Sequence, residues 1–270
     1  KDKQVTGYQE TGIIETNKFS QAVGSYTATS SKNATCELMV SIRVNGSWSR
    51  YLSYGAWGLG LENKATNQSD SIGKIAIDIV QPISGEADAF KLKLVLKRNN
   101  VNVESPKVTL IALTLKFTNY TFNVDISNIP DEVHYKINNL YQQIVPTIGN
   151  SICSATSSTM LLNYKGHSFE GLADYEHEYM AWIVRDYKNN IFGNWTYNTI
   201  AMGAFGETSY VKKFCSLNEL LFHLATVGPL AASVGGYVIN NVKNYNTGGH
   251  LLVISGYKIE NGQISLYIND

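Results

Sequence analysis

The chain has 270 residues, of which 44% are hydrophobic and 16% are charged, and its 22 basic residues balance its 22 acidic ones. No block of like charge occurs, which argues against electrostatic binding of nucleic acid and against a polybasic membrane anchor. No apolar run reaches the roughly 18 residues that a membrane-spanning helix needs, so we expect no membrane span. The length is enough for one large domain or for two of ordinary size.

The first 120 residues consist of stretches in which apolar and polar residues alternate. A period of two places one face of a strand in a core and the other face in solvent. Several such strands, separated by turns rich in Gly, Asn and Ser, predict an antiparallel β-sandwich, jelly-roll-like, as an accessory domain over residues 1–120. The alternating stretches are residues 38–44, 75–79, 92–96 and 111–117.

Residues 121–133 are predicted to be a linker, because the stretch is polar and contains Pro130. Beyond it, apolar and aromatic side chains recur at helical spacing over residues 173–187. The capping box Ser216-Leu-Asn-Glu219 opens another helix, which Gly228-Pro229 ends. Strands are then predicted over residues 230–234, 251–257 and 264–268. Helices followed by antiparallel strands predict an α+β domain over residues 134–270.

The three cysteines, Cys36, Cys153 and Cys215, are far apart in the sequence and odd in number. No CxxC pair and no cluster of His and Cys with zinc spacing occurs, so neither a disulfide framework nor a metal site is indicated. A single Cys with a distant His is one signature of a catalytic thiol, although a chain with one buried free Cys has the same signature.

The segment after Cys153 predicts a helix of about three turns that Gly166 closes at its C′ position. Cys153 would then lie at the N-terminus of that helix. Unpaired N–H groups and the positive end of the helix dipole stabilise a thiolate at such a position. A histidine beside the thiolate would complete a nucleophile that works at neutral pH.

His250 is the candidate for that histidine. It follows Gly248-Gly249, which would let a substrate approach closely, and it opens an apolar strand. The chain then turns at Glu260-Asn-Gly262 and returns to Asp270. A three-residue loop or a β-bulge would place His250 and Asp270 on one face as diagonal neighbours, whereas a two-residue Asn-Gly turn alone would place them on opposite faces. On one face, Asp270 would orient the imidazole and stabilise its charged form.

Several motifs carry a resemblance to a known family. In the second half they are Cys153-Ser-Ala-Thr-Ser-Ser-Thr-Met-Leu-Leu162, Gly193-Asn-Trp-Thr-Tyr-Asn198, Gly228-Pro229, Gly248-Gly-His-Leu-Leu-Val-Ile-Ser-Gly-Tyr257 and Tyr267-Ile-Asn-Asp270. Together they resemble the papain-like cysteine peptidases of the double-glycine leader-peptidase type, a C-39-like family. In the first half, Val44-Asn-Gly-Ser-Trp-Ser49 and Tyr54-Gly-Ala-Trp57 resemble the β-domain that precedes the peptidase in the secreted branch of that family.

The resemblance implies roles for individual residues. Cys153, His250 and Asp270 would form the catalytic triad in this order, with Asn269 as the alternative orienting residue. A Gln upstream of the Cys supplies an oxyanion-hole donor in that family. The candidates for it here are Gln142 and Gln143, and Gln142 is preferred because its spacing from Cys153 matches the secreted branch. The residues expected to bind substrate are Gly249, Asn194 and Trp195.

The predicted function is that of a cysteine peptidase acting on a peptide or protein, with no metal and no organic cofactor. One alternative is an amidase or acyltransferase that acts on cell-wall peptides through the same triad. The other is a non-catalytic protein that binds a glycan or a protein. Its platform would be Trp48, Tyr51, Tyr54 and Trp57, although such residues more often pack in a core. A composition rich in Tyr, Asn, Ser and Thr is common in secreted bacterial proteins, so we expect a secreted or cell-surface protein whose signal peptide has been removed.

Overall fold

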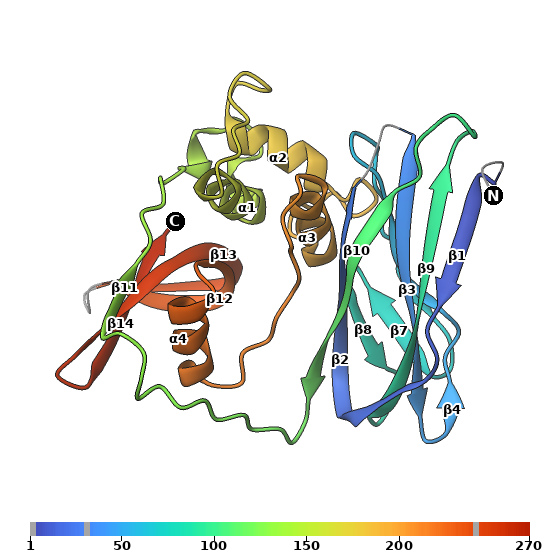
Figure 1. Ribbon diagram of the computed structural model, residues 1–270, viewed down its shortest axis with the longest axis horizontal. Helices are drawn as coiled ribbons and strands as arrows, with labels where there is room; N and C mark the ends of the chain where they lie inside the picture. Colours follow the sequence, from blue (N-terminus) through green and yellow to red (C-terminus); the bar gives the residue numbers. More distant parts are fainter. Residues whose placement is uncertain (1–3, 30–32, 240–242) are drawn as a thin grey trace. The chain divides into compact units, whose positions relative to one another are not determined.

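The computed structural model describes residues 4–29, 33–239 and 243–270, without the side chains of residues 237–247. The chain forms two compact units (Figure 1). The first unit combines Lys1–Tyr120 with Ile183–Lys213, and the second combines Thr121–Trp182 with Phe214–Asp270. The interpretation of residues 134–270 as one continuous domain therefore differs from the spatial grouping, because residues 183–213 pack with the N-terminal half.

Antiparallel strands build the first unit into one ten-stranded sheet that curves as a half-barrel. This confirms the predicted antiparallel β fold of the N-terminal half. The long strands β2, β3, β9 and β10 form its body. The strands are β1 Thr6–Glu10, β2 Ile14–Thr29, β3 Ala34–Val44, β4 Ser47–Trp48, β5 Leu52–Trp57, β6 Gln68–Ser69, β7 Gly73–Ala76, β8 Ile79–Pro82, β9 Ala87–Arg98 and β10 Lys107–Phe117.

The core of this unit lies on one face of β3 and β9, as the period of two predicts. Leu38, Val40 and Ile42 are fully buried. They pair across the ladder with Leu94, Leu92 and Phe90 of β9. Each fully buried Leu, Ile or Phe side chain stabilises the fold by about 1.5–3 kcal/mol relative to an exposed one.

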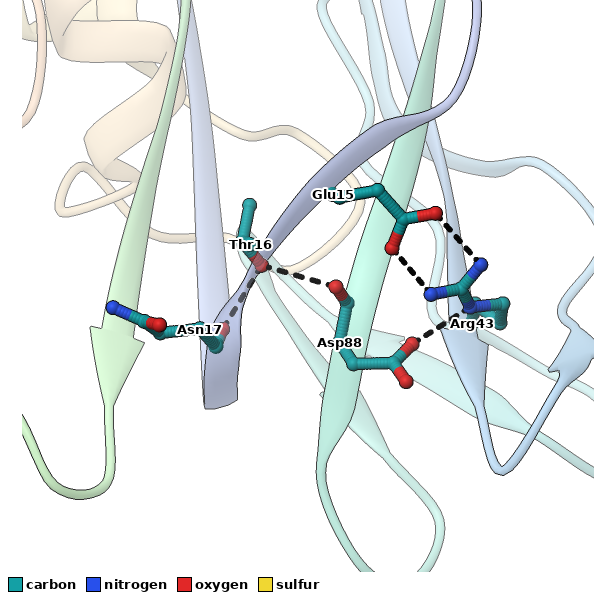
Figure 2. Close-up of polar contacts among 5 residues, drawn as sticks. All are labelled: Glu15, Thr16, Asn17, Arg43 and Asp88. Atoms are coloured by element: carbon teal, nitrogen blue, oxygen red, sulfur yellow. Dashed lines mark hydrogen bonds and ion pairs between the residues drawn. The ribbon is translucent and has the colours of Figure 1, made fainter.

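A polar network joins three strands of the first unit (Figure 2). Arg43 of β3 donates through Nη1 to Glu15 of β2 at 2.9 Å and through Nε to Asp88 of β9 at 2.8 Å. The hydroxyl of Thr16 also donates to the Asp88 carbonyl at 3.4 Å. The Glu15 side chain is 65% exposed, so solvent screens this pair and the network fixes register more than it adds stability.

Two members of the expected glycan platform lie inside the protein. Tyr54 is 0% exposed and Trp57 is 1% exposed, so these two residues pack in the core, as the more common alternative predicted, and are not part of a surface platform. Trp48 and Tyr51 are half-buried. The Lys91 ammonium lies 4.4 Å from the centroid of the Trp48 ring.

The predicted strand over residues 75–79 is a tight hairpin instead. β7 ends at Ala76 and β8 begins at Ile79, and Ile77 between them has a φ of 60°. A β-branched residue rarely adopts a positive φ, and Ile77 also continues the alternating pattern. The sequence therefore predicted a straight strand at the point where the chain reverses. Asp78 is buried in this turn.

A helix that the sequence interpretation did not predict, α3 (Trp195–Ala204), packs against β2. The Thr196 hydroxyl donates to the Gly24 carbonyl of β2 at 2.7 Å. Gly203 lies so close to β2 that an added Cβ would stand 3.0 Å from Cα of Thr27. With the core on one face and α3 on the other, β2 is buried from Ala22 through Ala28.

The second unit contains a four-stranded sheet in which β13 pairs with each of the other three strands. Its strands are β11 Glu132–His134, β12 Leu230–Ile239, β13 Lys243–Glu260 and β14 Gln263–Asn269. The unit also contains η1 Gln142–Ile144, η2 Gly149–Ser151, α1 Cys153–Tyr164, α4 Leu217–Thr226 and all but the last two residues of α2 Glu176–Val184. These elements confirm the α+β prediction, and β11 pairs where the end of a linker was expected. No helix in the described ranges is long and apolar enough to cross a bilayer.

Helices cover both faces of β13. Leu221 and Leu224 of α4 cluster with Leu252 and Ile254, whereas Met160 of α1 clusters with Val253. Neighbouring residues of a strand point to opposite faces, so α1 and α4 lie on opposite sides of the sheet. The predicted N-cap also forms, because the Ser216 hydroxyl accepts from the Glu219 N–H at 3.1 Å, and the Glu219 carboxylate accepts from the N–H of the preceding residue, Cys215, at 2.8 Å.

Candidate active site

Cys153 is the first residue of α1, and its side chain is half-buried. The N-cap residue Ile152 supplies no side-chain cap, and the Thr156 N–H is the first to bond within the helix, to the Ile152 carbonyl at 2.9 Å. The N–H groups of the first turn therefore have no partner inside the helix, and the positive end of its dipole lies at Cys153. This end of α1 favours a negative charge on the sulfur or on a bound oxygen.

His250 and Asp270 lie in direct contact in the second unit. Nε2 of His250 is 2.6 Å from Oδ1 of Asp270. The His250 ring is shielded from solvent, since the residue is only 7% exposed, while the Asp270 side chain is 31% exposed. A carboxylate at this distance fixes the ring orientation and stabilises an imidazolium.

The turn between β13 and β14 differs from the expected three-residue loop. Glu260 pairs with Gln263, and Asn261 and Gly262 alone connect the strands, with φ of 51° and 75°. Positive φ at both positions is the geometry of a type I′ hairpin turn, for which Asn-Gly is the favoured sequence. The three-residue loop is therefore wrong, and this turn alone would put His250 and Asp270 on opposite faces.

A β-bulge restores the shared face. The register between β13 and β14 shifts between Ile254 and Gly256, so that Ser255 is one residue too many on β13. Beyond the shift, Val253 pairs with Asn269. Extending this register by one pair sets Asp270 opposite Leu252, two residues along the strand from His250 and on the same face.

Gly256 makes the bulge possible. Its φ is +155°, and an added Cβ would stand 1.9 Å from the Val133 carbonyl oxygen of β11. Only glycine combines this backbone conformation with so close an approach of a neighbouring strand. A glycine inside a strand pattern is a known signal for a bulge, and it was the available clue in the sequence.

Two asparagines tie the end of β14 to the segment before η1. The Asn139 side chain donates to the Asp270 carbonyl at 3.2 Å, and the Asn269 side chain donates to the Ile137 carbonyl at 3.2 Å. The geometry thus brings Asp270, rather than Asn269, to the imidazole. The contribution of Asn139 was not anticipated, since nothing in its local sequence distinguishes it from a surface asparagine.

Gln142, the preferred oxyanion donor, is half-buried at the start of η1, and Gln143 is exposed. The Gln142 Nε2 donates to the Gly149 carbonyl at 2.9 Å. A carbonyl can only accept, so this contact fixes the orientation of the amide with its nitrogen toward η2. The Gly149–Ser151 turn leads directly to Ile152 and Cys153.

The thiol and the imidazole do not form a hydrogen bond in this structure. Within the described ranges, no hydrogen bond joins Cys153 to His250. Hydrogen bonds between catalytic groups are often long without substrate and tighten when it binds. Both residues belong to the second unit. Along β13, His250 shares the face of Leu252 and Ile254, which pack against α4, whereas Val253 on the other face packs against α1, so these packing contacts do not by themselves bring the imidazole to the thiol.

The residues expected to bind substrate have different surroundings. Gly249 is exposed, with a φ of +156° and open space where a Cβ would be, so a ligand could approach the backbone beside His250. Asn194 and Trp195 lie in the first unit. Asn194 is fully buried as the N-cap of α3, where its side chain accepts from the Tyr197 N–H at 3.0 Å. The Trp195 N–H donates to the Asp78 carboxylate.

Burial is the main cause of the shifted pKa values of Cys36 and His177. Burial raises the pKa of Cys36 to about 12, so its thiol stays protonated in the core of the β domain. Burial also lowers the pKa of His177. No group of three His, Cys, Asp or Glu side chains in the described part of the chain is arranged to hold a metal ion.

Two family models match the chain. The Peptidase_C39 like family matches residues 134–270, and the Peptidase C39 N-terminal domain matches residues 10–115. No curated protein and no solved structure matches it. The first match spans the stretch that holds Cys153, His250 and Asp270.

Proposed function

The chain belongs to the Peptidase_C39 like family, as the sequence resemblance predicted, and we propose that it is a cysteine peptidase with the triad Cys153, His250 and Asp270. The observation that carries the proposal is the 2.6 Å contact between His250 and Asp270, which a β-bulge sets up in the unit where Cys153 begins a helix. A structural role alone would not require a polar pair at this position, because a buried His can be satisfied by the backbone.

In the proposed mechanism His250 removes the thiol proton of Cys153, and the sulfur attacks the peptide carbonyl carbon. Because Nε2 faces Asp270, Nδ1 is the nitrogen assigned to this proton. The resulting oxyanion accepts hydrogen bonds from the Cys153 N–H and the Gln142 amide. The C–N bond then breaks and His250 gives its proton to the leaving amine. Water, deprotonated by His250, attacks the thioester, and Cys153 leaves as the thiol.

The test is cleavage of a mixed peptide library followed by mass spectrometry. Wild-type protein should produce new peptide termini. Cys153→Ala should produce none, and Cys215→Ala, which removes an exposed thiol in the same unit, should retain the wild-type rate. Wild-type protein that leaves peptides and cell-wall peptides uncut at neutral pH, while folded, would contradict the proposal.

An amidase or acyltransferase on cell-wall peptides would use the same groups. The two chemistries differ in the acceptor of the acyl group, which is water in hydrolysis and an amine in transfer. Addition of an amine such as hydroxylamine or glycine amide separates them. Products that carry the added amine in proportion to its concentration would identify transfer.

For the N-terminal half we propose a glycan-binding face made of residues that differ in part from the aromatic set suggested by the sequence. Tyr8, 69% exposed, lies with Tyr51 around the Lys93 ammonium, at 4.2 and 5.5 Å from the ring centroids. Trp48 adds a third aromatic ring beside Lys91. Aromatic faces next to charged hydrogen-bonding groups suit the apolar and hydroxyl faces of a sugar. A Tyr8→Ala/Trp48→Ala variant should lose binding to insoluble cell-wall polysaccharide, and unchanged binding would contradict this proposal.

A secreted or cell-surface location is part of the same proposal. It rests on the composition, which includes 17 Tyr and only 16% charged residues. Fractionation of cells that express the full-length protein tests it, because the protein should appear in the medium or the cell-wall fraction.

A further inference from the structure

The segment between Gln142 and Cys153 contains more internal hydrogen bonds than a simple connecting loop needs. The Val145 N–H donates to the Gln142 carbonyl at 3.2 Å, and the Gly149 N–H donates to the Val145 carbonyl at 3.1 Å. The Gln142 side chain then donates to the Gly149 carbonyl at 2.9 Å. Gly149 therefore bonds back to the segment 142–145 twice, once through its N–H to Val145 and once through its carbonyl to the Gln142 side chain.

Gly149 can lie there only because it has no side chain. A Cβ at this position would stand 2.7 Å from the Gln142 carbonyl oxygen and 3.2 Å from Cα of Gln143, and both are backbone atoms that cannot rotate away. The residue is buried. Its φ is not in the left-handed region, so close contact, and not backbone conformation, requires glycine here.

The chain bends back to make this contact at Thr147. The Ile148 N–H donates to the Pro146 carbonyl at 2.7 Å, and Thr147 between them has a φ of 69°. A bond from residue i+2 to residue i with a positive φ at the centre is the rare γ-turn, and it is unfavourable for a β-branched residue. Strain of this kind, of order 1–3 kcal/mol, persists only where surrounding contacts maintain it, and it clusters at functional sites.

We propose that Gly149 is a positioning residue that holds the Gln142 amide for catalysis. The inference rests on the proposed peptidase function, in which Gln142 stabilises the oxyanion. The amide nitrogen carries two hydrogens. One is bound by the Gly149 carbonyl, which fixes the plane of the amide, and the other is thereby directed to the oxyanion. The γ-turn at Thr147 brings the carbonyl into place.

This arrangement has an energetic reason. A donor that is fixed before the reaction does not lose side-chain entropy when the oxyanion forms, so its bond contributes fully to the transition state. Removal of one oxyanion donor typically lowers kcat by about 10²–10³-fold, and a displacement of about 1 Å in a catalytic group can cost 10²-fold. Loss of the Gly149 contact should therefore reduce acyl transfer by roughly 10- to 100-fold.

The test compares two reactions of Cys153 that need no known substrate. Acetylation by p-nitrophenyl acetate passes through an oxyanion, whereas alkylation by iodoacetamide does not. Both rates are measured on the full chain by peptide mapping of Cys153. Gln142→Ala should lower the acetylation rate by about 10²–10³-fold and Gly149→Ala by about 10- to 100-fold, and both should leave the alkylation rate within twofold of wild type.

The double variant Gln142→Ala/Gly149→Ala decides whether Gly149 acts through Gln142. If it does, the double variant loses no more acetylation than Gln142→Ala alone, because the amide is already absent. Gly12→Ala, where an added Cβ meets no atom within 4 Å, should behave as wild type. Thr147→Gly accepts a positive φ without strain and should keep the acetylation rate. If Gly149→Ala does not fold, Thr147→Pro, which fixes φ near −65° and opens the γ-turn, should lower acetylation in its place.

The outcomes separate the two claims. Wild-type Cys153 that alkylates no faster than Cys215 would overturn the proposed function and this inference with it. A reactive Cys153 whose acetylation falls in Gln142→Ala but not in Gly149→Ala would overturn the positioning role alone. The positioning role would also be overturned if the double variant lost acetylation by the product of the two single-variant factors.

Discussion

Replacement of Gly256 by alanine tests the part of the fold on which the site depends. The new Cβ would lie 1.9 Å from the Val133 carbonyl oxygen, 2.8 Å from its carbon and 2.9 Å from Cα of His134, all of them backbone atoms of β11. Overpacking of this kind costs about 1–3 kcal/mol. A non-glycine residue at an unfavourable φ costs about 1–3 kcal/mol more. The sum, about 2–6 kcal/mol, is a large fraction of the 5–15 kcal/mol by which domains are stable.

Urea denaturation measures this loss directly, and Gly235→Ala is the control, because an added Cβ there meets no atom within 4 Å. Gly256→Ala should move the unfolding midpoint of the second unit to lower urea, with unchanged slope, while the control stays near wild type. If the strand instead escapes the clash by losing the bulge, the variant stays folded but His250 and Asp270 separate, and peptidase activity falls. A Gly256→Ala variant with both wild-type stability and wild-type activity would refute the account of the bulge.

Three further variants probe other parts of the structure. Asp270→Ala should lower kcat/KM by roughly 10²–10⁴-fold with a small effect on stability, because the imidazole loses its orienting carboxylate; unchanged kcat/KM would exclude the triad role. Asn194→Ala should destabilise the first unit by about 1 kcal/mol through loss of the α3 cap, and a change in KM without a change in stability would contradict this capping role. Burial raises the pKa of Asp78 to about 6, above its value near 3.8 in the unfolded chain. The protonated carboxyl therefore stabilises the folded state in acid, and this stabilisation is lost as the pH rises from about 3.8 through about 6. Between pH 4 and pH 7 the free energy of unfolding of the wild type should therefore fall by on the order of 3 kcal/mol relative to that of Asp78→Asn. If the free energies of unfolding of the two proteins change in parallel with pH, this prediction is refuted.

Local signals in the sequence were enough to predict α1, which begins at the candidate nucleophile, and α4. Gly166, with a φ of 95°, marks the end of α1, and the capping box at Ser216 opens α4. Each of these signals acts within one turn of helix, so no tertiary contact can alter it easily. The position of Cys153 at a helix N-terminus could be inferred for this reason.

Features that depend on distant contacts could not be predicted in the same way. α3 has no clear apolar stripe, because buried Thr196 and Asn198 are satisfied by hydrogen bonds to specific carbonyls, one of them on β2. Ile77 continues an alternating pattern, yet it lies in a turn. The shared face of His250 and Asp270 depended on one inserted residue, since a register shift by a single position reverses every side chain. The sequence left the loop and the bulge as alternatives, and only the pairing of β13 with β14 distinguishes them.

The most direct test of the proposed mechanism is the pH dependence of thiol labelling. The chain provides its own standards, since Cys215 is exposed and Cys36 is buried with a pKa raised to about 12. Iodoacetamide at mildly acidic pH, followed by peptide mapping, should modify Cys153 well before Cys215. His250→Ala should abolish this preference, whereas the matched variant His167→Ala should preserve it. Equal and slow modification of Cys153 and Cys215 in the wild type would contradict an activated thiolate–imidazole pair and, with it, the proposed peptidase mechanism.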